Sequence, residues 1–202
     1  MPLSTGPDGA LPILETGADG RVRGTVTSVA GALEADTLLV LVGTDAGPAL
    51  AVVEAADASL TPVSSFDMTR QLADVTLADA PARVVAADGE AAVRRGLQVG
   101  AALLASEQAG VARWCFDETL AYLKVRTQFG RVVGGFQAIK HRLADLFADV
   151  EAASAAAVNA AAALAADDPD LPIATAVAQS YCSDVAVRAA EEAVQLHGGI
   201  GM

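Results

Sequence analysis

Two short stretches in the second half of the chain carry residues that could bind an anion. The first, RTQFGRVVGGFQ, places four such side chains around a tight turn between two helical patterns: Arg126, Gln128, Phe129 and Gln137. A guanidinium can hold two phosphate oxygens at once, and each charge-assisted hydrogen bond contributes roughly 1.5–3 kcal/mol. An aromatic ring can cover a ligand ring, and a side-chain amide can pair with its edge. The stretch therefore favours a site for a diphosphate that is attached to a ring system.

The second stretch, AVQLHGGIGM, ends the last helical pattern in a glycine-rich loop. Gln195 lies about one turn before the glycine loop that begins with Gly198 and Gly199, and His197 directly precedes that loop. Glycines allow the backbone to approach a ligand closely, and their N–H groups can face an anion. Each stretch also has a purely structural interpretation. The first suits a helix–loop–helix turn with cations near a helix C-terminus, and the second suits a helix C-cap.

The composition restricts what such an anion site can belong to. The net charge is −12 and the pI about 4.4, which argues against nucleic-acid binding and against adhesion to an anionic membrane. The apolar runs are too short or too interrupted to predict a membrane-inserted helix, and MPLSTGPDGALP does not resemble a secretory signal. The two cysteines, Cys115 and Cys182, favour reduced thiols and a cytoplasmic location. Together with His141 and His197 they show no metal-ligand spacing, so we predict no metal site.

The residues before about position 87 predict strands. Short apolar runs alternate with turn signals such as Asp-Gly, Gly-Pro and Thr-Pro. The predicted strands lie within four segments: Arg21–Val29, Asp36–Thr44, Ala49–Ala55 and Gln71–Ala80. We predict a small antiparallel β domain over residues 1–87, with a sandwich-like or barrel-like form.

The residues from position 88 onward predict long helices, because the apolar spacing becomes helical and alanine is abundant. We expect helices over about 89–126, 136–166 and 171–197, with Pro172 in the first turn of the third. Long helices joined by short loops are typical of an up-and-down bundle. The predicted fold class is therefore α+β, with the β domain followed by a helical domain over residues 88–202.

Three motifs in order resemble the C-terminal helical domain of the acyl-CoA dehydrogenases. They are R-x-Q-F-G, F-Q-x-I-x-x-x-L-A-D and Q-x-H-G-G-x-G, and the resemblance covers roughly Gly96 to Met202. The first 85 residues are more weakly similar to the middle β domain of that family. The resemblance implies an oligomer, homomeric or heteromeric, that binds FAD at a subunit interface. Its implied reaction is the oxidation of an acyl-CoA thioester to the trans-2-enoyl form.

The resemblance also implies roles for the residues of both stretches, which would contact the ADP half of a neighbouring subunit's FAD. Arg126 would bind the pyrophosphate, with Gln128 and Phe129 beside it, and Gln137 would lie near the adenine. Gln195 and the backbone of His197, Gly198 and Gly199 would form the rest of the surface that contacts this part of the FAD.

The chain also departs from the family pattern. No N-terminal helical domain is recognisable, and Leu3–Pro7 does not resemble the family's glycine-rich flavin loop. Residues 28–30 read Ser-Val-Ala where the family has Trp-Ile-Thr over the flavin. One family position of the catalytic glutamate is Gly100 here, and the other would lie beyond Met202, where we expect two further helices. Glu107 is two turns from Gly100, about 10 Å along a helix, so we assign no catalytic residue.

Three functional hypotheses follow from this pattern. The chain is a catalytic subunit that works only in an assembled oligomer, and the isolated chain is expected to be inactive. Alternatively, it is a non-catalytic subunit that completes the FAD site of a catalytic partner. The third hypothesis is a helical scaffold that no longer binds flavin.

Overall fold

The structure, a computed structural model, describes residues 10–202, so the comparison of Leu3–Pro7 with a flavin loop lies outside the described residues. The chain forms two compact units that divide between Leu97 and Gln98. The composition changes near residue 87, where the last strand of the sheet has just ended at Ala86 and the first long helix begins at Gly89.

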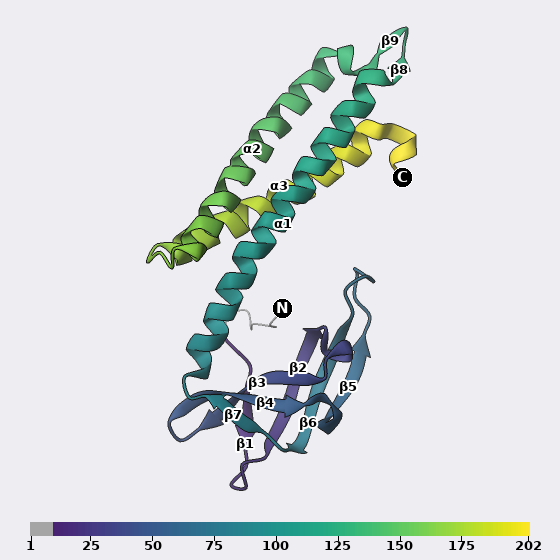
Figure 1. The fold of residues 1–202 in the computed structure, drawn as a ribbon. Helices are drawn as coiled ribbons and strands as arrows, with labels where there is room; N and C mark the ends of the chain where they lie inside the picture. Colours follow the sequence, from purple (N-terminus) through teal and green to yellow (C-terminus); the bar gives the residue numbers. More distant parts are fainter. Residues whose placement is uncertain (1–9) are drawn as a thin grey trace. The chain divides into compact units, whose positions relative to one another are not determined.

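The first unit is built on a seven-stranded sheet of order β5-β6-β2-β1-β3-β4-β7 (Figure 1). Its strands are β1 (Ile13–Thr16), β2 (Val22–Ala30), β3 (Thr37–Thr44), β4 (Gly47–Glu54), β5 (Ala58–Val63), β6 (Leu72–Ala80) and β7 (Arg83–Ala86). The predicted α+β class and the antiparallel sheet are confirmed, except that β1 pairs with β3 in parallel. The four predicted strands correspond to β2, β3, β4 and β6.

Alternation of side chains explains how these strands form a core. In β4, for example, Ala49, Ala51 and Val53 are buried, whereas Glu54 at its end is exposed. Such alternation is expected of a strand that packs one face against the core. Short 3-10 helices, η1 (Ala32–Glu34) and η2 (Ala55–Asp57), connect strands of the sheet.

The second unit contains three long helices, the first of which begins before the division, and the predicted up-and-down arrangement is confirmed (Figure 1). The helices are α1 (Gly89–Val125), α2 (Gln137–Ala165) and α3 (Leu171–His197). A small hairpin, β8 (Thr127–Gln128) with β9 (Arg131–Val132), and a 3-10 turn, η3 (Val133–Gly135), join α1 to α2. A final 3-10 turn, η4 (Gly198–Gly201), follows α3. All three helix predictions agree with the structure to within one residue at each end.

Small side chains at the helix contacts form much of this core. Alanines from all three helices are completely buried, among them Ala105, Ala153 and Ala189. The distance between packed helices depends on the side chains at their contact, so alanine surfaces allow a close approach. Cys115 and Cys182 are buried in the same core as free thiols, and the cytoplasmic location inferred from them stays a prediction.

Among the described helices, α2 alone is long and apolar enough to cross a membrane by length and composition. Its buried residues Leu143, Leu146 and Val150 pack in the core that α1 and α3 share. Charged residues also link it to both neighbours, through the pairs Arg113–Glu151 and Arg188–Asp149. These contacts are those of a core helix in a bundle.

Candidate functional site

The chain reverses direction in a two-residue turn immediately after α1. In the β8–β9 hairpin Gln128 pairs with Arg131, so that Phe129 and Gly130 form the turn with φ angles of 54° and 77°. Two positive φ values are expected of this tight hairpin turn, where Asn-Gly is the favoured pair. A phenylalanine in this region of φ is uncommon and strained, and such strain is typical of residues with a functional role.

Aromatic contacts hold the Phe129 ring at the tip of the hairpin. Its centroid lies 6.3 Å from that of Phe136, in an edge-to-face arrangement. The Arg131 guanidinium covers the Phe136 ring, 3.8 Å from its centroid. The Phe129 side chain nevertheless remains 91% exposed. The hairpin therefore presents an open aromatic face that its neighbours orient.

Backbone hydrogen bonds fix Arg126 although it lies beyond the end of α1. Its N–H donates to the Tyr122 carbonyl at 2.9 Å, and its own carbonyl accepts from the Val133 N–H at 2.8 Å. Gly134 makes this packing possible, because a Cβ there would lie 2.8 Å from the Leu123 carbonyl oxygen. Among residues 10–202, no carboxylate pairs with the Arg126 guanidinium. Its charge is therefore available to a ligand.

The end of α3 forms the opposite wall. The His197 ring stacks on Tyr122 with centroids 4.4 Å apart, and its Nδ1 bonds to the Ala193 carbonyl at 2.7 Å. The chain then turns at Gly198, where φ is 66°. A Cβ at Gly198 or Gly199 would meet no atom within 4 Å. The glycine backbone is thus open to close approach, as a ligand-binding loop requires.

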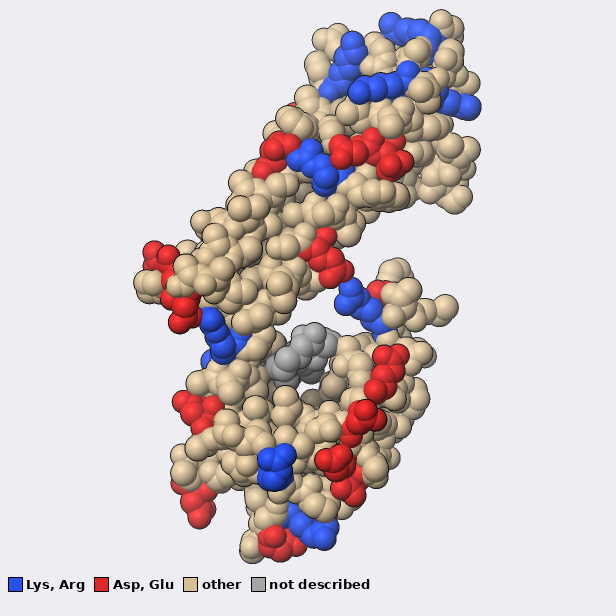
Figure 2. Space-filling view, viewed as in Figure 1, with Lys and Arg blue, Asp and Glu red and all other residues tan. Residues whose placement is uncertain are grey.

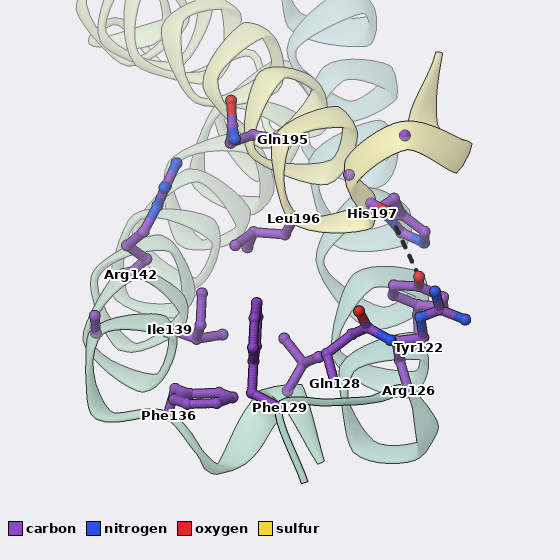
Figure 3. A pocket seen from close by; sticks show the side chains of 14 residues that line it. Tyr122, Arg126, Gln128, Phe129, Phe136, Ile139, Arg142, Gln195, Leu196 and His197 are labelled. Atoms are coloured by element: carbon purple, nitrogen blue, oxygen red, sulfur yellow. Dashed lines mark hydrogen bonds between the residues drawn. The ribbon is translucent and has the colours of Figure 1, made fainter. Parts of the chain in front are cut away.

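The two stretches meet in one pocket of about 530 Å³. Figure 3 shows Phe129 in its middle, with Arg126 and Tyr122 on one side and Ile139 and Arg142 on the other. Seven of the eight residues proposed from the sequence line it: Arg126, Gln128, Phe129, Gln195, His197, Gly198 and Gly199. Gln137 does not, because it is directed along α2, where its Nε2 lies 3.5 Å from Nε2 of His141.

The pocket contains residues that sequence reasoning missed. Tyr122, in the last turn of α1, precedes Arg126 by four residues, and this spacing was a usable signal because it places both on one side of the helix end. Arg142 gave no such signal. Its Nε and Nη2 donate to Glu192 at 2.9 and 2.8 Å, and this bonding raises the pKa of the Arg142 guanidinium. Because Glu192 offsets the charge of Arg142, Arg126 contributes more of the pocket's attraction for an anion.

The pocket lies at a strongly basic end of an acidic protein. Residues 124–142 contain five basic residues and no Asp or Glu, a local charge of +5, although the whole chain carries 13 basic and 25 acidic residues. Figure 2 shows Lys and Arg gathered at the end of the helical unit that carries β8 and β9. Such a concentration of charge raises the local concentration of anionic ligands.

The positions that the sequence analysis compared with the family's catalytic glutamate and flavin-covering residues lie elsewhere in the chain. Gly100 lies within α1, and a Cβ there would meet no atom within 4 Å. It has no side chain that could take up a proton. Residues 28–30 end β2, where Ser28 has a φ of 55° and its N–H donates to Asp74 Oδ1 at 2.8 Å.

Known proteins are similar to this chain in both sequence and fold. The sequence model of the acyl-CoA dehydrogenase C-terminal domain matches residues 87–202. Acyl-CoA dehydrogenase FadE34 of Mycobacterium tuberculosis is 43% identical over 141 residues, which cover 69% of this chain and 19% of that protein. These residues therefore represent a small part of that relative.

Two solved structures are similar along nearly the whole chain. A G363A variant of the steroid acyl-CoA dehydrogenase Tcur3481–Tcur3483 has a TM-score of 0.79 and 34% identity, over 94% of this chain and 52% of that one. The ChsE4–ChsE5 complex of Mycobacterium tuberculosis has a TM-score of 0.76 and 29% identity, over 93% and 52%. This chain thus spans about half the length of these solved relatives. With the motifs, the fold and the matched domain in agreement, the chain belongs to the acyl-CoA dehydrogenase family.

Proposed function

We propose that this chain is a subunit of an FAD-dependent acyl-CoA dehydrogenase and that its pocket binds the ADP part of an FAD held by a neighbouring subunit. One observation carries the proposal. Two stretches about 70 residues apart in the sequence, each with residue types suited to a dinucleotide, line the same pocket. A plain helix–loop–helix turn and a separate helix C-cap would not require this convergence.

The chemistry of the pocket fits a dinucleotide. The unpaired Arg126 guanidinium suits the diphosphate, because bidentate charge-assisted hydrogen bonds favour two phosphate oxygens. The exposed ring of Phe129 suits stacking on an adenine, and the open backbone at Gly198 and Gly199 suits close contact with the ligand. When bound, FAD supplies the hydride acceptor for oxidation of an acyl-CoA thioester.

The residues of this chain have holding and orienting roles in that reaction. Arg126 neutralises phosphate charge, and Phe129 limits the movement of the nucleotide end. The stack of His197 on Tyr122 fixes the start of the glycine loop. A ligand held rigidly at one end presents its reactive end in fewer orientations, which lowers the entropic barrier to reaction.

A second candidate function, that of a non-catalytic subunit, is compatible with Gly100. Because this residue has no side chain, Gly100 cannot act as the catalytic base. A non-catalytic subunit would still supply the pocket to a catalytic partner's FAD. The solved relatives Tcur3481–Tcur3483 and ChsE4–ChsE5 each carry the names of two proteins, and the second is described as a complex. A heteromeric arrangement is therefore a reasonable alternative for this chain.

The visible flavin absorbance of the purified protein tests these alternatives. The chain is expressed alone and together with a second acyl-CoA dehydrogenase subunit, and the number of bound flavins per chain is determined. One FAD per chain supports the catalytic subunit, and one FAD per pair of different chains supports the non-catalytic one. A folded but colourless protein in both preparations would contradict the proposal. Bleaching of the bound flavin by an acyl-CoA thioester would identify the substrate class.

A further inference from the structure

A second concavity, of about 490 Å³, opens on another face of the α1–α2 pair. We call it the groove, and it is lined by Phe116, Leu120, Leu123, Lys124, Val132, Gly134, Lys140, Leu143, Ala144 and Phe147. None of these residues lines the pocket. The floor is apolar, and Phe147 remains 46% exposed. Within residues 10–202, the groove is therefore an apolar surface that is open and distinct from the candidate nucleotide site.

Two cations border this apolar floor, Lys124 from α1 and Lys140 from α2. Within residues 10–202, neither ammonium forms an ion pair. An apolar surface with unpaired ammonium groups is complementary to an apolar surface that carries carboxylates. The occupant expected of the groove is thus an acidic amphipathic helix.

The outer face of α3 has this character. Ile173, Val177, Val187 and Val194 are 66, 57, 60 and 48% exposed. Asp184 lies seven residues after Val177, and Val187, Glu191 and Val194 follow it at steps of three, four and three residues. These six side chains therefore share one helical face. Both carboxylates are exposed and, in the described part of the chain, form no ion pair. We call this face the acidic stripe.

The spacing of the two surfaces also agrees. Asp184 and Glu191 are seven residues apart, which is about 10 Å along a helix. Lys124 and Lys140 project from two helices whose axes, when packed, lie roughly 8–10 Å apart. A helix that crosses the groove can therefore bring one carboxylate to each ammonium. Val187, between the two acids, would then lie on the apolar floor.

We propose that copies of this chain associate by laying the acidic stripe of one copy across the groove of another. Every copy offers both surfaces, so two reciprocal contacts can form about a twofold axis. The proposal builds on the oligomer in the proposed function and assigns the surface that assembles it. It does not depend on whether the pocket binds FAD, because no groove residue lines the pocket.

The molar mass of the full chain in solution, measured by sedimentation velocity, tests this interface through a charge exchange. The wild type is expected to self-associate. The variant Lys124→Glu/Lys140→Glu and the variant Asp184→Lys/Glu191→Lys should each associate at least about 10-fold more weakly, since each places like charges face to face. The quadruple variant, which restores complementarity with reversed signs, should recover association. Asp45→Lys, an exposed change in the first unit, should leave the mass unchanged.

Circular dichroism melts of all variants check that the charge changes leave the fold intact. A monomeric wild type, or a quadruple variant as weak as the double variants, would overturn the proposal. Association with a co-expressed family subunit in place of a second copy would also overturn it. A monomeric chain that becomes yellow only with such a subunit would overturn this interface and leave the proposed function standing.

Discussion

The pocket and the groove occupy different faces of the same two helices, yet they are constructed differently. The pocket takes its functional groups from irregular backbone, namely the hairpin turn at Phe129 and the glycine loop after α3. The groove takes most of its lining from regular helical positions such as Leu120 and Lys140. One surface is shaped by positive φ angles and glycines, and the other by ordinary side chains on a helix face.

This difference explains what each surface can recognise. Fixed loops and helix ends hold a few polar groups at defined positions, as a small ligand requires. A helix face offers an extended apolar area with charges around it, which suits another helix. The sites should therefore respond to different mutations, and the following predictions use that contrast.

The largest effect is expected at Gly134, which packs against the end of α1 and lines the groove. In Gly134→Ala the added Cβ would lie 2.8 Å from the Leu123 carbonyl oxygen, so the backbone must move. We expect a loss of about 1–3 kcal/mol in the free energy of unfolding, measured by urea denaturation. Because the same movement displaces the hairpin, both flavin retention and self-association should weaken. The adjacent Gly135→Ala is a suitable control, since its nearest neighbour is 4.0 Å away. An unchanged unfolding midpoint in Gly134→Ala would show that the two sites are not coupled through this contact.

An intermediate effect, confined to the pocket, is expected at Phe129. Phe129→Asn keeps a residue that tolerates a φ of 54° but removes the ring. Stability should stay the same or rise by up to about 1 kcal/mol, since strain is relieved. Flavin retention, measured by gel filtration and absorbance, should fall roughly 10-fold because base stacking is lost. The sedimentation of the variant should match the wild type. Full flavin retention would remove Phe129 from the proposed site.

The smallest effect concerns the two thiols in the shared core. Burial raises the pKa of Cys115 and of Cys182 above the ordinary value of 9.0. Because the folded state favours the protonated thiol, this contribution to stability is complete below the unfolded pKa and is lost as the pH rises through the higher folded pKa. We expect little alkylation by iodoacetamide at pH 8 in the native protein and full alkylation in urea. Rapid labelling of the native protein would indicate that the core opens.

Much of the fold could be predicted because local sequence patterns indicate its elements. The three helices have long apolar series and clear ends, such as the His197-Gly198 helix end and Pro172 in the first turn of α3. Three strands of the seven-stranded sheet were missed for physical reasons. β1 and β7 have four residues each, too few to display a period, and β5 contains Pro62. The parallel pairing of β1 with β3 is a long-range contact that no local pattern reveals.

The candidate site divides in the same way. Arg126, Phe129 and the glycines after α3 could be proposed because turns and loops need particular residue types. Arg142 could not, since its pairing with Glu192 joins positions 50 residues apart. The groove had no signature either, because lysine and leucine on a helix are compatible with a plain solvated surface.

The retention of FAD by Arg126→Ala, compared with Lys140→Ala, tests the central claim most directly. Both variants remove one cation from the same basic end, but Arg126 lines the pocket and Lys140 lines the groove. The proposal predicts that Arg126→Ala binds FAD roughly 10- to 100-fold more weakly in the assembled protein, because charge-assisted bonds to phosphate are lost. Lys140→Ala should retain flavin like the wild type. Equal retention by both variants, or equal loss, would contradict the assignment of this pocket to the diphosphate.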